Sequence, residues 1–304
     1  MILNENFKIY DSLKNEVQKY ARYIGLNNIS KDYLKNVIIP LVIHLVNKRE
    51  DKTLKFYISG GQGSGKSTVS KFIKFYLKNY FNYNVASLSL DDIYLSKKDR
   101  VALSSKIHPL LITRGVPGTH NVEQGIKIIK KLDSGKNQKI ILPVFSKLND
   151  DVAIKDNWTT FNGKPDFIIF DGWCVGAEAQ PKDFWNGPIN DLEKKYDKDG
   201  QWSKWVNTQL LENYQKLFNL FDISIYIKSK NFKQIIRNRW EQEKTNIKTE
   251  SMKSKTNHLK TYKEIHHLAM HFERITKCME KYMPEKVDIL LMRQSKYDFS
   301  IIKK

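Results

Sequence analysis

The chain has 304 residues and a formal charge of +19, from 52 basic and 33 acidic side chains, and 40% of its residues are hydrophobic. This length and apolar fraction can bury a core in one large or two small domains, which excludes a mostly disordered chain. With only Cys174 and Cys278, the sequence excludes a disulfide scaffold and a cysteine-rich zinc site and favours a reducing compartment. The longest apolar run, residues 37–46, is too short to span a bilayer, and the first residues lack the order of a secretion signal. We therefore expect a soluble, cytoplasmic protein.

The positive charge comes almost entirely from lysine, which is scattered along the whole chain. Arginine, whose forked guanidinium grips phosphates and reads bases, is scarce. We interpret the charge as a solvated surface, whose field would also attract a small anionic substrate, rather than as a nucleic-acid-binding face. A nucleic-acid partner is therefore not expected, and the sequence leaves a monomer or a homodimer open.

Two helices are predicted at the beginning of the chain, over residues 4–23 and 33–46, because apolar residues recur there at helical spacing. The pattern then changes to short apolar or β-branched runs separated by longer segments, of which residues 67–80 form the strongest amphipathic helix. The five runs are residues 56–58, 85–90, 167–170, 223–227 and 287–292. Short apolar strands that alternate with helices indicate a parallel sheet shielded on both faces. We predict one α/β domain over residues 52–304, with a helical N-terminal extension over residues 1–51.

A phosphate-binding loop is indicated by residues 60–67, GGQGSGKS, which match G-x-x-x-x-G-K-[ST] between a predicted strand and a predicted helix. Glycines allow backbone N–H groups to turn inward around an anion, and the following helix adds its partial positive charge. Lys66 is expected to reach the outer phosphates, and the hydroxyl of Ser67 is a hard ligand for Mg²⁺. The residues expected to bind the nucleoside triphosphate are Gly60, Gly61, Gln62, Gly63, Ser64, Gly65, Lys66, Ser67 and Thr68.

Three aspartates follow two of the predicted strands, on the side where the functional loops of a parallel sheet gather. Asp91 and Asp92 come after the second run, and Asp171 comes after the third. Phosphoryl transfer to an alcohol needs Mg²⁺ between the phosphates and a group that orients the hydroxyl or takes its proton. Asp171 has the position of a Walker B acid and is expected to hold the metal with Ser67. Asp91 is expected to act on the hydroxyl and Asp92 to cap a helix, although the sequence alone leaves both open as the base.

Six motifs follow one another along the chain. They are SGGQGSGKST (59–68), SLDDIYL (89–95), TRGVPGTHN (113–121), LPVFSK (142–147), IIFDGWCVG (168–176) and RNRWEQE (237–243). Together they resemble the glycerate kinases of plant and fungal type, which are P-loop kinases related to phosphoribulokinase, uridine kinase and bacterial pantothenate kinase. The resemblance covers about residues 35–290, and R-G-x-P-G-T-H and F-D-G-W-C-x-G are its most particular motifs. It implies a P-loop kinase fold and transfer of the γ-phosphate of ATP to a hydroxyl of D-glycerate.

The resemblance also implies roles for single residues. Asp91 matches the proposed base of the related kinases, and Arg114 and His120 lie in the stretch that faces the acceptor. Arg114 offers a bidentate fork to a carboxylated acceptor, while His120 suits a hydrogen-bonded loop histidine better than a proton carrier. Lys147 matches a lysine of the same region. The alternative interpretation is that Lys147 is simply one of the many surface lysines of the chain. Arg239 matches an arginine of the lid helix that approaches the transferring phosphate.

The lid arginine has an alternative partner, and three positions depart from the family pattern. Arg239 can also pair with Glu243, one helical turn further on. Asp171 stands where the family usually has Glu, and Asn121 stands where it commonly has Asp. Residues 148–156, LNDDVAIKD, replace a Gly-rich stretch that contains arginine. These differences concern the choice of acceptor rather than the binding of nucleotide.

The sequence therefore predicts an ATP- and Mg²⁺-dependent kinase of a small alcohol, and D-glycerate is the acceptor that the resemblance favours. The predicted site residues are Lys66, Asp91 and Arg239 for catalysis, Ser67 and Asp171 for the metal, and Asp91, Arg114, His120 and Lys147 for the acceptor. Within the same class, the alternatives are kinases that act on uridine, pantothenate or ribulose 5-phosphate. Outside it, the charge suggests a nucleic-acid-stimulated NTPase, and a nucleotide-binding protein without catalysis is a third possibility.

Overall fold

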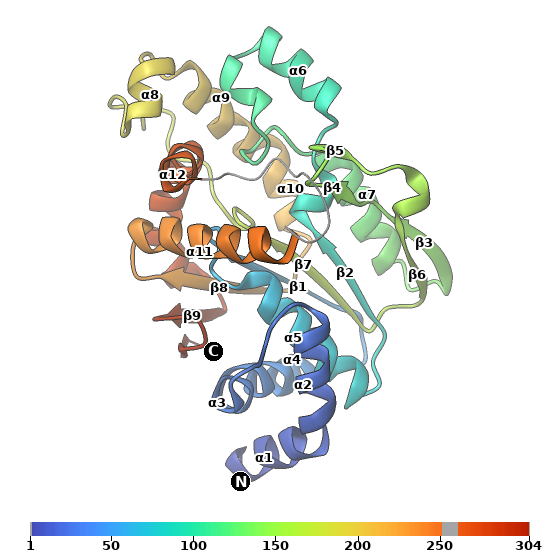
Figure 1. Cartoon of the computed structure of the whole chain (residues 1–304). Helices are drawn as coiled ribbons and strands as arrows, with labels where there is room; N and C mark the ends of the chain where they lie inside the picture. The colour runs from blue at the N-terminus through green and yellow to red at the C-terminus, as the bar shows by residue number, and fades with distance from the viewer. Residues whose placement is uncertain (1, 251–260, 304) are drawn as a thin grey trace.

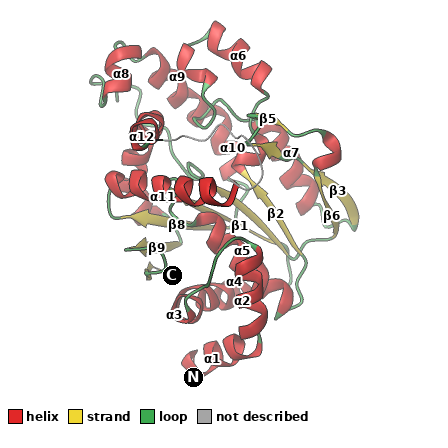
Figure 2. Cartoon of the chain, viewed as in Figure 1, coloured by secondary structure: helices red, strands yellow, loops and turns green. Residues whose placement is uncertain are grey.

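The computed structural model describes residues 2–250 and 261–303 and shows a six-stranded sheet with helices on both faces (Figures 1 and 2). The strand order is β10–β9–β8–β1–β7–β2, in which β9, β8, β1, β7 and β2 are parallel and β10 is antiparallel to β9. The strands are β1 (Leu54–Gly60), β2 (Val85–Ser89), β7 (Phe167–Gly172), β8 (Ile223–Ser229), β9 (Ile289–Arg293) and β10 (Phe299–Lys303). The five predicted runs are the five parallel strands, so the predicted α/β fold is confirmed. The edge strand β10 was not predicted.

Both faces of the sheet are buried, each in its own core cluster. Consecutive residues of a strand point to opposite faces, so each strand contributes to both clusters. In β7, Phe167 and Ile169 belong to one core cluster, whereas Ile168 and Phe170 belong to the other. Figure 1 shows the N-terminal helices and α5 below the sheet, and α7, α9, α10 and α12 above it. The covering helices are α5 (Lys66–Asn79), α7 (Val122–Asp133), α9 (Gln201–Gln209), α10 (Gln215–Phe218) and α12 (Tyr262–Lys286). Helix α5 is the amphipathic helix that the sequence predicts over residues 67–80.

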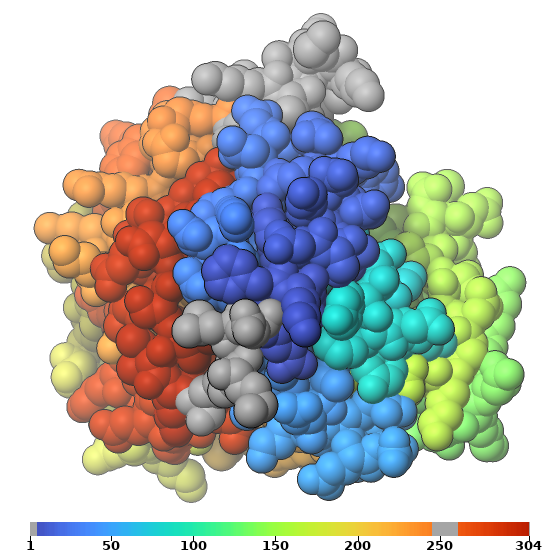
Figure 3. Space-filling model, turned by 90° about the horizontal axis from the view of Figure 1, so that it is seen from below, coloured from blue at the N-terminus to red at the C-terminus, as the bar shows by residue number. Residues whose placement is uncertain are grey.

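The N-terminal helices pack against the sheet and share its lower core cluster. They are α1 (Ile2–Ser12), α2 (Lys14–Tyr23), α3 (Lys31–Tyr33), η1 (Leu34–Ile38) and α4 (Ile39–Lys48). The first predicted helix is divided at Leu13, and the second contains one π-helical turn just before Pro40, which has no N–H to donate. The ring of Tyr20 stacks on Phe75 of α5 at 5.0 Å. Figure 3 shows these helices lying between the C-terminal segment and α5. The predicted boundary at residue 52, between the N-terminal extension and the α/β domain, stays a prediction.

Two small antiparallel hairpins and several further helices lie outside these layers. The sequence predicted two of these helices, the one that Asp92 caps and the one that carries Arg239 and Glu243, and not the other elements. The hairpins pair β3 (Gln138–Leu142) with β6 (Thr159–Gly163) and β4 (Phe145–Ser146) with β5 (Asp151–Val152). The helices are η2 (Leu90–Ile93), α6 (Lys97–Lys106), η3 (Pro109–Ile112), η4 (Lys155–Asn157), α8 (Asp191–Tyr196), η5 (Leu210–Tyr214) and α11 (Phe232–Glu250). The strands of the hairpins and the one-turn helices among these elements carry too few residues for a periodic pattern, so their tertiary neighbours decide their conformation. No helix within the described residues is long and apolar enough to cross a membrane.

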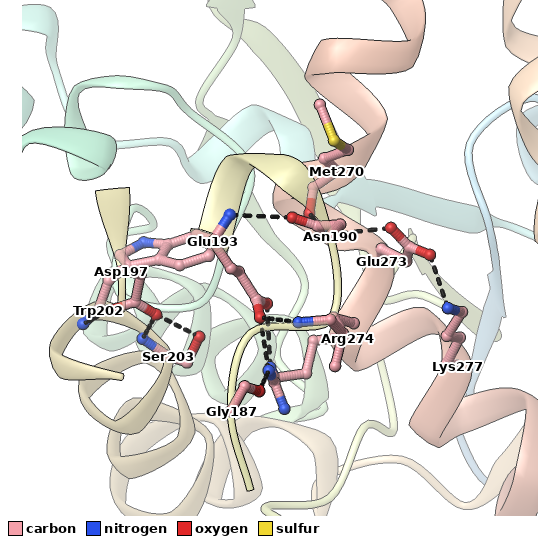
Figure 4. A network of polar contacts seen from close by, with 11 residues as sticks. Gly187, Asn190, Glu193, Asp197, Trp202, Ser203, Met270, Glu273, Arg274 and Lys277 are labelled. Carbon is pink, nitrogen blue, oxygen red and sulfur yellow. Dashed lines mark hydrogen bonds and ion pairs between the residues drawn. The ribbon is translucent and has the colours of Figure 1, made fainter. Parts of the chain in front are cut away.

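A buried polar network fastens α8 and α9 to α12 (Figure 4). Arg274 of α12 donates from Nε to Glu193 Oε1 at 3.0 Å and from Nη2 to Glu193 Oε2 at 2.5 Å, and Glu193 is fully buried. The side chain of Asn190, the N-cap of α8, donates to the carbonyl of Met270 at 3.0 Å. Asp197 accepts from the backbone N–H of Trp202 at 2.7 Å at the start of α9. This network fixes α9, which continues directly into η5 beside the candidate site.

Candidate active site

The phosphate-binding loop turns sharply between β1 and α5. Gly60, the last residue of β1, has φ +149°, and a Cβ there would lie 2.6 Å from the carbonyl oxygen of Ile227 on β8. Gly65 caps α5 with φ +99°, in the left-handed region that favours glycine. Helix α5 then begins at Lys66, so its N-terminal N–H groups face the inside of the loop. The predicted loop is therefore formed by backbone groups and a helix terminus, which suit an anion.

Lys66 is held inside this loop. Its Nζ donates to the carbonyl oxygen of Gly61 at 3.0 Å. Loss of solvent lowers the pKa of Lys66 to about 8, although the negative charges of Asp171 and Asp91 act in the opposite direction. An ammonium group in this state gains stabilisation from a bound phosphate. The loop therefore fits the triphosphate that the sequence predicts.

Ser67 and Asp171 meet beside the loop and fit the metal that the motif implies. The hydroxyl of Ser67 donates to Asp171 Oδ2 at 3.1 Å. Asp171 lies at the carboxyl end of β7 and is buried, which raises its pKa from the usual value. A hydroxyl and a carboxylate are hard oxygen ligands, and Mg²⁺ bound with phosphates needs only one or two such protein groups. The chemistry of the two residues therefore fits a metal bound with phosphates, and their role as its ligands stays a prediction.

Asp91 and Asp92 are adjacent in sequence but have different environments. Asp92 Oδ2 accepts from the backbone N–H of Ser89 at 2.9 Å in a capping box at the start of η2. Burial raises the pKa of Asp92 to about 6. Asp91 instead points to two side chains: Tyr94, whose hydroxyl donates to Oδ1 at 2.9 Å, and Lys147, whose Nζ donates to Oδ2 at 2.6 Å. Asp92 is thus engaged in the helix cap, whereas the carboxylate of Asp91 faces Tyr94 and Lys147.

The ionisation of Asp91 is set by two opposing effects. Burial alone would raise the pKa of Asp91. The charge and hydrogen bond of Lys147, together with the hydroxyl of Tyr94 and the charge of Lys66, outweigh burial and lower that pKa to about 2. Asp91 is therefore a carboxylate at neutral pH, and it is a weak base as long as Lys147 remains bound to it.

Arg114 already has a carboxylate partner in this structure. Its Nη1 donates to Oδ1 of Asp150, and its guanidinium lies 5.4 Å from the ring of Phe145. The same Asp150 oxygen lies 3.0 Å from Nη2 of Arg100, a fully buried arginine that also donates to the carbonyl oxygens of Ile112 and Asp150. Asp150 lies in the segment that departs from the family pattern and has φ +52°. Arg114 is thus paired with a carboxylate of the chain itself.

His120 lies between Tyr94 and Tyr214. Its ring stacks on Tyr94 with centroids 4.6 Å apart, and its Nδ1 lies 2.6 Å from the hydroxyl oxygen of Tyr214 on η5. Burial lowers the pKa of His120 to about 3, so the imidazole is neutral at physiological pH. His120 is therefore a buried, uncharged hydrogen-bonding group.

Helix α11 contacts the phosphate loop directly. A Cβ at Gly63 would lie 2.7 Å from the backbone carbon of Asn238 and 2.8 Å from the backbone nitrogen of Arg239. The side chain of Arg239, however, forms an ion pair with Glu243 and donates from Nη1 to Gln242 at 3.0 Å. Arg239 is thus paired within its own helix, and the backbone of that helix lies against the phosphate loop.

Several residues of the site were missed in the sequence. Arg293 of β9 donates from Nη1 to the carbonyl oxygen of Gly63, and Phe299 of β10 lies next to Gly65. The contact of Phe299 depends on the unpredicted β10, and the bond of Arg293 joins residues 230 positions apart, so no local pattern signals either of them. Tyr94 had a signal, because its position three residues after Asp91 in SLDDIYL brings the two together in a helical turn.

The sequence has distant relatives among proteins named as kinases. No protein-family model matches the chain. The uncharacterized kinase mug58 of Schizosaccharomyces pombe is 26% identical over 261 residues, which are 83% of this chain and 87% of that protein. The chloroplastic D-glycerate 3-kinase of Arabidopsis thaliana is 27% identical over 172 residues, which are 52% of this chain and only 37% of that enzyme.

Solved structures agree in fold over nearly the whole chain. The D-glycerate 3-kinase from Cryptococcus neoformans superposes with a TM-score of 0.65 at 19% identity, covering 87% of this chain and 96% of that one. The YGR205w protein superposes with a TM-score of 0.66 at 22% identity, covering 87% of this chain and 95% of that one. The fold is that of the P-loop kinases. The fold that the sequence motifs implied is therefore confirmed.

Proposed function

We propose that the protein is an ATP-dependent kinase of a small alcohol, and that the alcohol is D-glycerate. The observation that carries this proposal is a convergence at the carboxyl ends of three adjacent strands, β1, β7 and β2. Lys66 follows β1, Asp171 ends β7 and Asp91 follows β2. Lys66 and Asp91 are close enough for each charge to shift the pKa of the other. A phosphate at Lys66 and a hydroxyl at Asp91 would then be neighbours, as direct transfer requires.

Residues of the loop and of β7 would hold the nucleotide and its metal. The backbone of residues 60–67 and the ammonium of Lys66 would bind the phosphates, and Ser67 and Asp171 would hold Mg²⁺. When bound, Mg²⁺ would offset the negative charge of the phosphates. The pKa of Lys66 would rise as the phosphates replace its lost solvent, so the residue stays charged during transfer.

Asp91 would orient the acceptor and receive its proton. As a carboxylate, Asp91 accepts a hydrogen bond from the hydroxyl that is phosphorylated, and this bond aims the oxygen at the γ-phosphorus. As the new oxygen–phosphorus bond forms and the bond to ADP breaks, the hydroxyl proton passes to Asp91. Release of Lys147 from Asp91 during acceptor binding would raise the pKa of Asp91 and make it a stronger base.

Glycerate is favoured among alcohols by charge and by resemblance. Arg114 provides a guanidinium fork whose charge acts on Tyr94, the residue that donates to Asp91, and two of the distant relatives are named D-glycerate 3-kinases. In this chain, the acceptor carboxylate would take the place of Asp150 on Arg114. The exchange of one carboxylate for another leaves Arg114 paired, so binding does not expose an uncompensated charge.

The test measures ADP release with Mg²⁺–ATP and, separately, D-glycerate, uridine, pantothenate and ribulose 5-phosphate. We expect ADP release to rise with D-glycerate and a phosphorylated product to be visible by ³¹P NMR. The variant Lys66→Met serves as the background control, because it retains the loop without its charge. ADP release no higher than this background with every alcohol would refute the kinase proposal, and preference for another alcohol would refute glycerate.

A further inference from the structure

The hydroxyl of Tyr214 determines which nitrogen of His120 carries a proton. Tyr214 is buried, and burial raises its pKa well above the usual value, so the hydroxyl keeps its proton. Its oxygen accepts from the backbone N–H of Gly118 at 2.8 Å, and the backbone N–H of His120 also acts on it. Nδ1 of His120, at 2.6 Å, is the acceptor that faces the hydroxyl proton.

It follows that Nδ1 of His120 is an acceptor and that Nε2 carries the ring proton. The neutral imidazole has one donor and one acceptor nitrogen, and Tyr214 occupies the acceptor. Within the described residues, Nε2 is buried and has no hydrogen-bond partner. An N–H group in this state has lost its water without gaining an acceptor, which is unfavourable until a ligand supplies one.

The unsatisfied N–H lies beside the group that would hold the acceptor. The His120 ring stacks on Tyr94 at 4.6 Å, and the Tyr94 hydroxyl donates to Asp91 at 2.9 Å. The negative charge of Asp91 also acts on the imidazole. The imidazole is thus separated from the carboxylate that would hold the alcohol by a single side chain, Tyr94.

We propose that His120, held in the Nε2–H form by Tyr214, donates a hydrogen bond to a second oxygen of the acceptor, next to the hydroxyl bound by Asp91. This inference rests on the proposed kinase function and narrows its substrate class. The acceptor is an alcohol with a neighbouring hydroxyl or carboxylate oxygen, and an alcohol without that oxygen leaves the buried N–H unpaired. Tyr214 is then a positioning residue, because it acts through His120.

The tautomer is tested without any activity measurement. In ¹⁵N-histidine-labelled protein, two-bond ¹H–¹⁵N NMR spectra distinguish a protonated from an unprotonated ring nitrogen, and the spectrum of His120→Gln assigns the signal of His120. We expect His120 to be Nε2-protonated and neutral from about pH 5 to 8, the range in which an unperturbed histidine titrates. In Tyr214→Phe, the single tautomer should be lost. A charged or Nδ1-protonated imidazole in the unmodified protein would overturn the inference.

The donor role is tested by steady-state kinetics. Loss of the N–H in His120→Leu should raise the KM for the acceptor about tenfold or more and leave the KM for ATP unchanged. His120→Gln, whose amide places an N–H near the position of Nε2, should recover part of that loss. Tyr214→Phe should also raise the acceptor KM. Tyr76→Phe, which removes a buried hydroxyl without a partner among the described residues, should not.

The outcomes separate this inference from the proposed function. Transfer by the unmodified protein with an unchanged acceptor KM in His120→Leu would overturn the donor role and leave the kinase proposal intact. Absence of transfer to any alcohol would overturn both.

Discussion

Asp150 pairs with Arg114 and Arg100 at the same time, so the guanidinium best suited to an acceptor carboxylate is occupied by a carboxylate of the chain itself. Arg100 is fully buried, whereas the side chains of Arg114 and Asp150 are 30% and 34% exposed. Arg114 and Asp150 are therefore the two of these three residues that a substrate can reach. Asp150 belongs to residues 148–156, one of the places where the sequence departs from the pattern of the glycerate kinases that it resembles.

Asp150→Asn should lower the KM for D-glycerate by about two- to fivefold, because a partly exposed ion pair contributes only modestly and its loss frees Arg114. Arg100 keeps the carbonyl oxygens of residues 112 and 150 in this variant. Asp151→Asn is the matched control, since Asp151 accepts backbone N–H bonds from Lys97 and Val152 instead. A higher KM in Asp150→Asn, with the control unchanged, would contradict displacement of Asp150 by the acceptor.

Asp91→Asn should reduce phosphoryl transfer by about 10²–10⁴-fold while ATP binding is retained. The neutral amide lacks the negative charge with which the carboxylate orients the acceptor hydroxyl, and it cannot take the proton of that hydroxyl. Asp92→Asn is the control in the same loop, since Asp92 caps η2 through Ser89. This control should lose stability rather than rate. Transfer and ATP binding are measured by coupled ADP detection and by calorimetry, and near-normal turnover in Asp91→Asn would exclude Asp91 as the base.

ATP affinity should fall as the pH rises above about 8. The pKa of Lys66 in the free protein is about 8, and bound phosphates favour its charged form. Below this pH the charge is already present, whereas above it a proton must be taken up on binding, so affinity falls up to about tenfold for each pH unit. Calorimetric titrations of the ATP complex across this range measure the effect.

Lys66→Met should bind ATP weakly at every pH, and its affinity should show no such decline. The same decline in the variant as in the unmodified protein would assign the pH dependence to another group.

Arg274→Met should destabilise the protein by about 3–5 kcal/mol, because it leaves the buried carboxylate of Glu193 without its partner. Urea unfolding measures this change. Lys194→Met is the control, because it also removes one positive charge, in this case from α8. The ion pair of Lys194 with Asp191 is largely exposed and contributes little to stability. Similar unfolding midpoints for the two variants would show that the network of Figure 4 does not stabilise α8 and α9.

The sequence predicts those parts of the site in which the functional groups and the local structure that positions them come from the same few neighbouring residues. The phosphate loop is one continuous stretch, so its glycines, Lys66 and Ser67 could be assigned roles before any fold was known. The position of Asp171 followed in the same way, because an acid directly after an apolar run ends a parallel strand. The capping bond of Asp92 was likewise accessible, since its partner is only three residues away.

The unpredictable part consists of contacts between distant segments. Lys147 reaches Asp91 across 56 positions, and Arg114 meets Asp150 across 36. Tyr214 lies 94 positions from His120, and Arg293 lies 230 from Gly63. None of these pairs has a periodicity or spacing that distinguishes it from the other lysines, tyrosines and aspartates of the chain. Such contacts exist only because the sheet and its covering helices bring the segments together.

By itself, the sequence determined the alternation of apolar strands with helices and the anion-binding turn after the first strand, because both arise from neighbouring residues. Only the tertiary structure decided that Asp91 is ionised, that His120 is neutral and that Arg114 holds an internal carboxylate. Ionisation depends on burial and on the charges within a few ångströms, and those surroundings come from segments far apart in the chain.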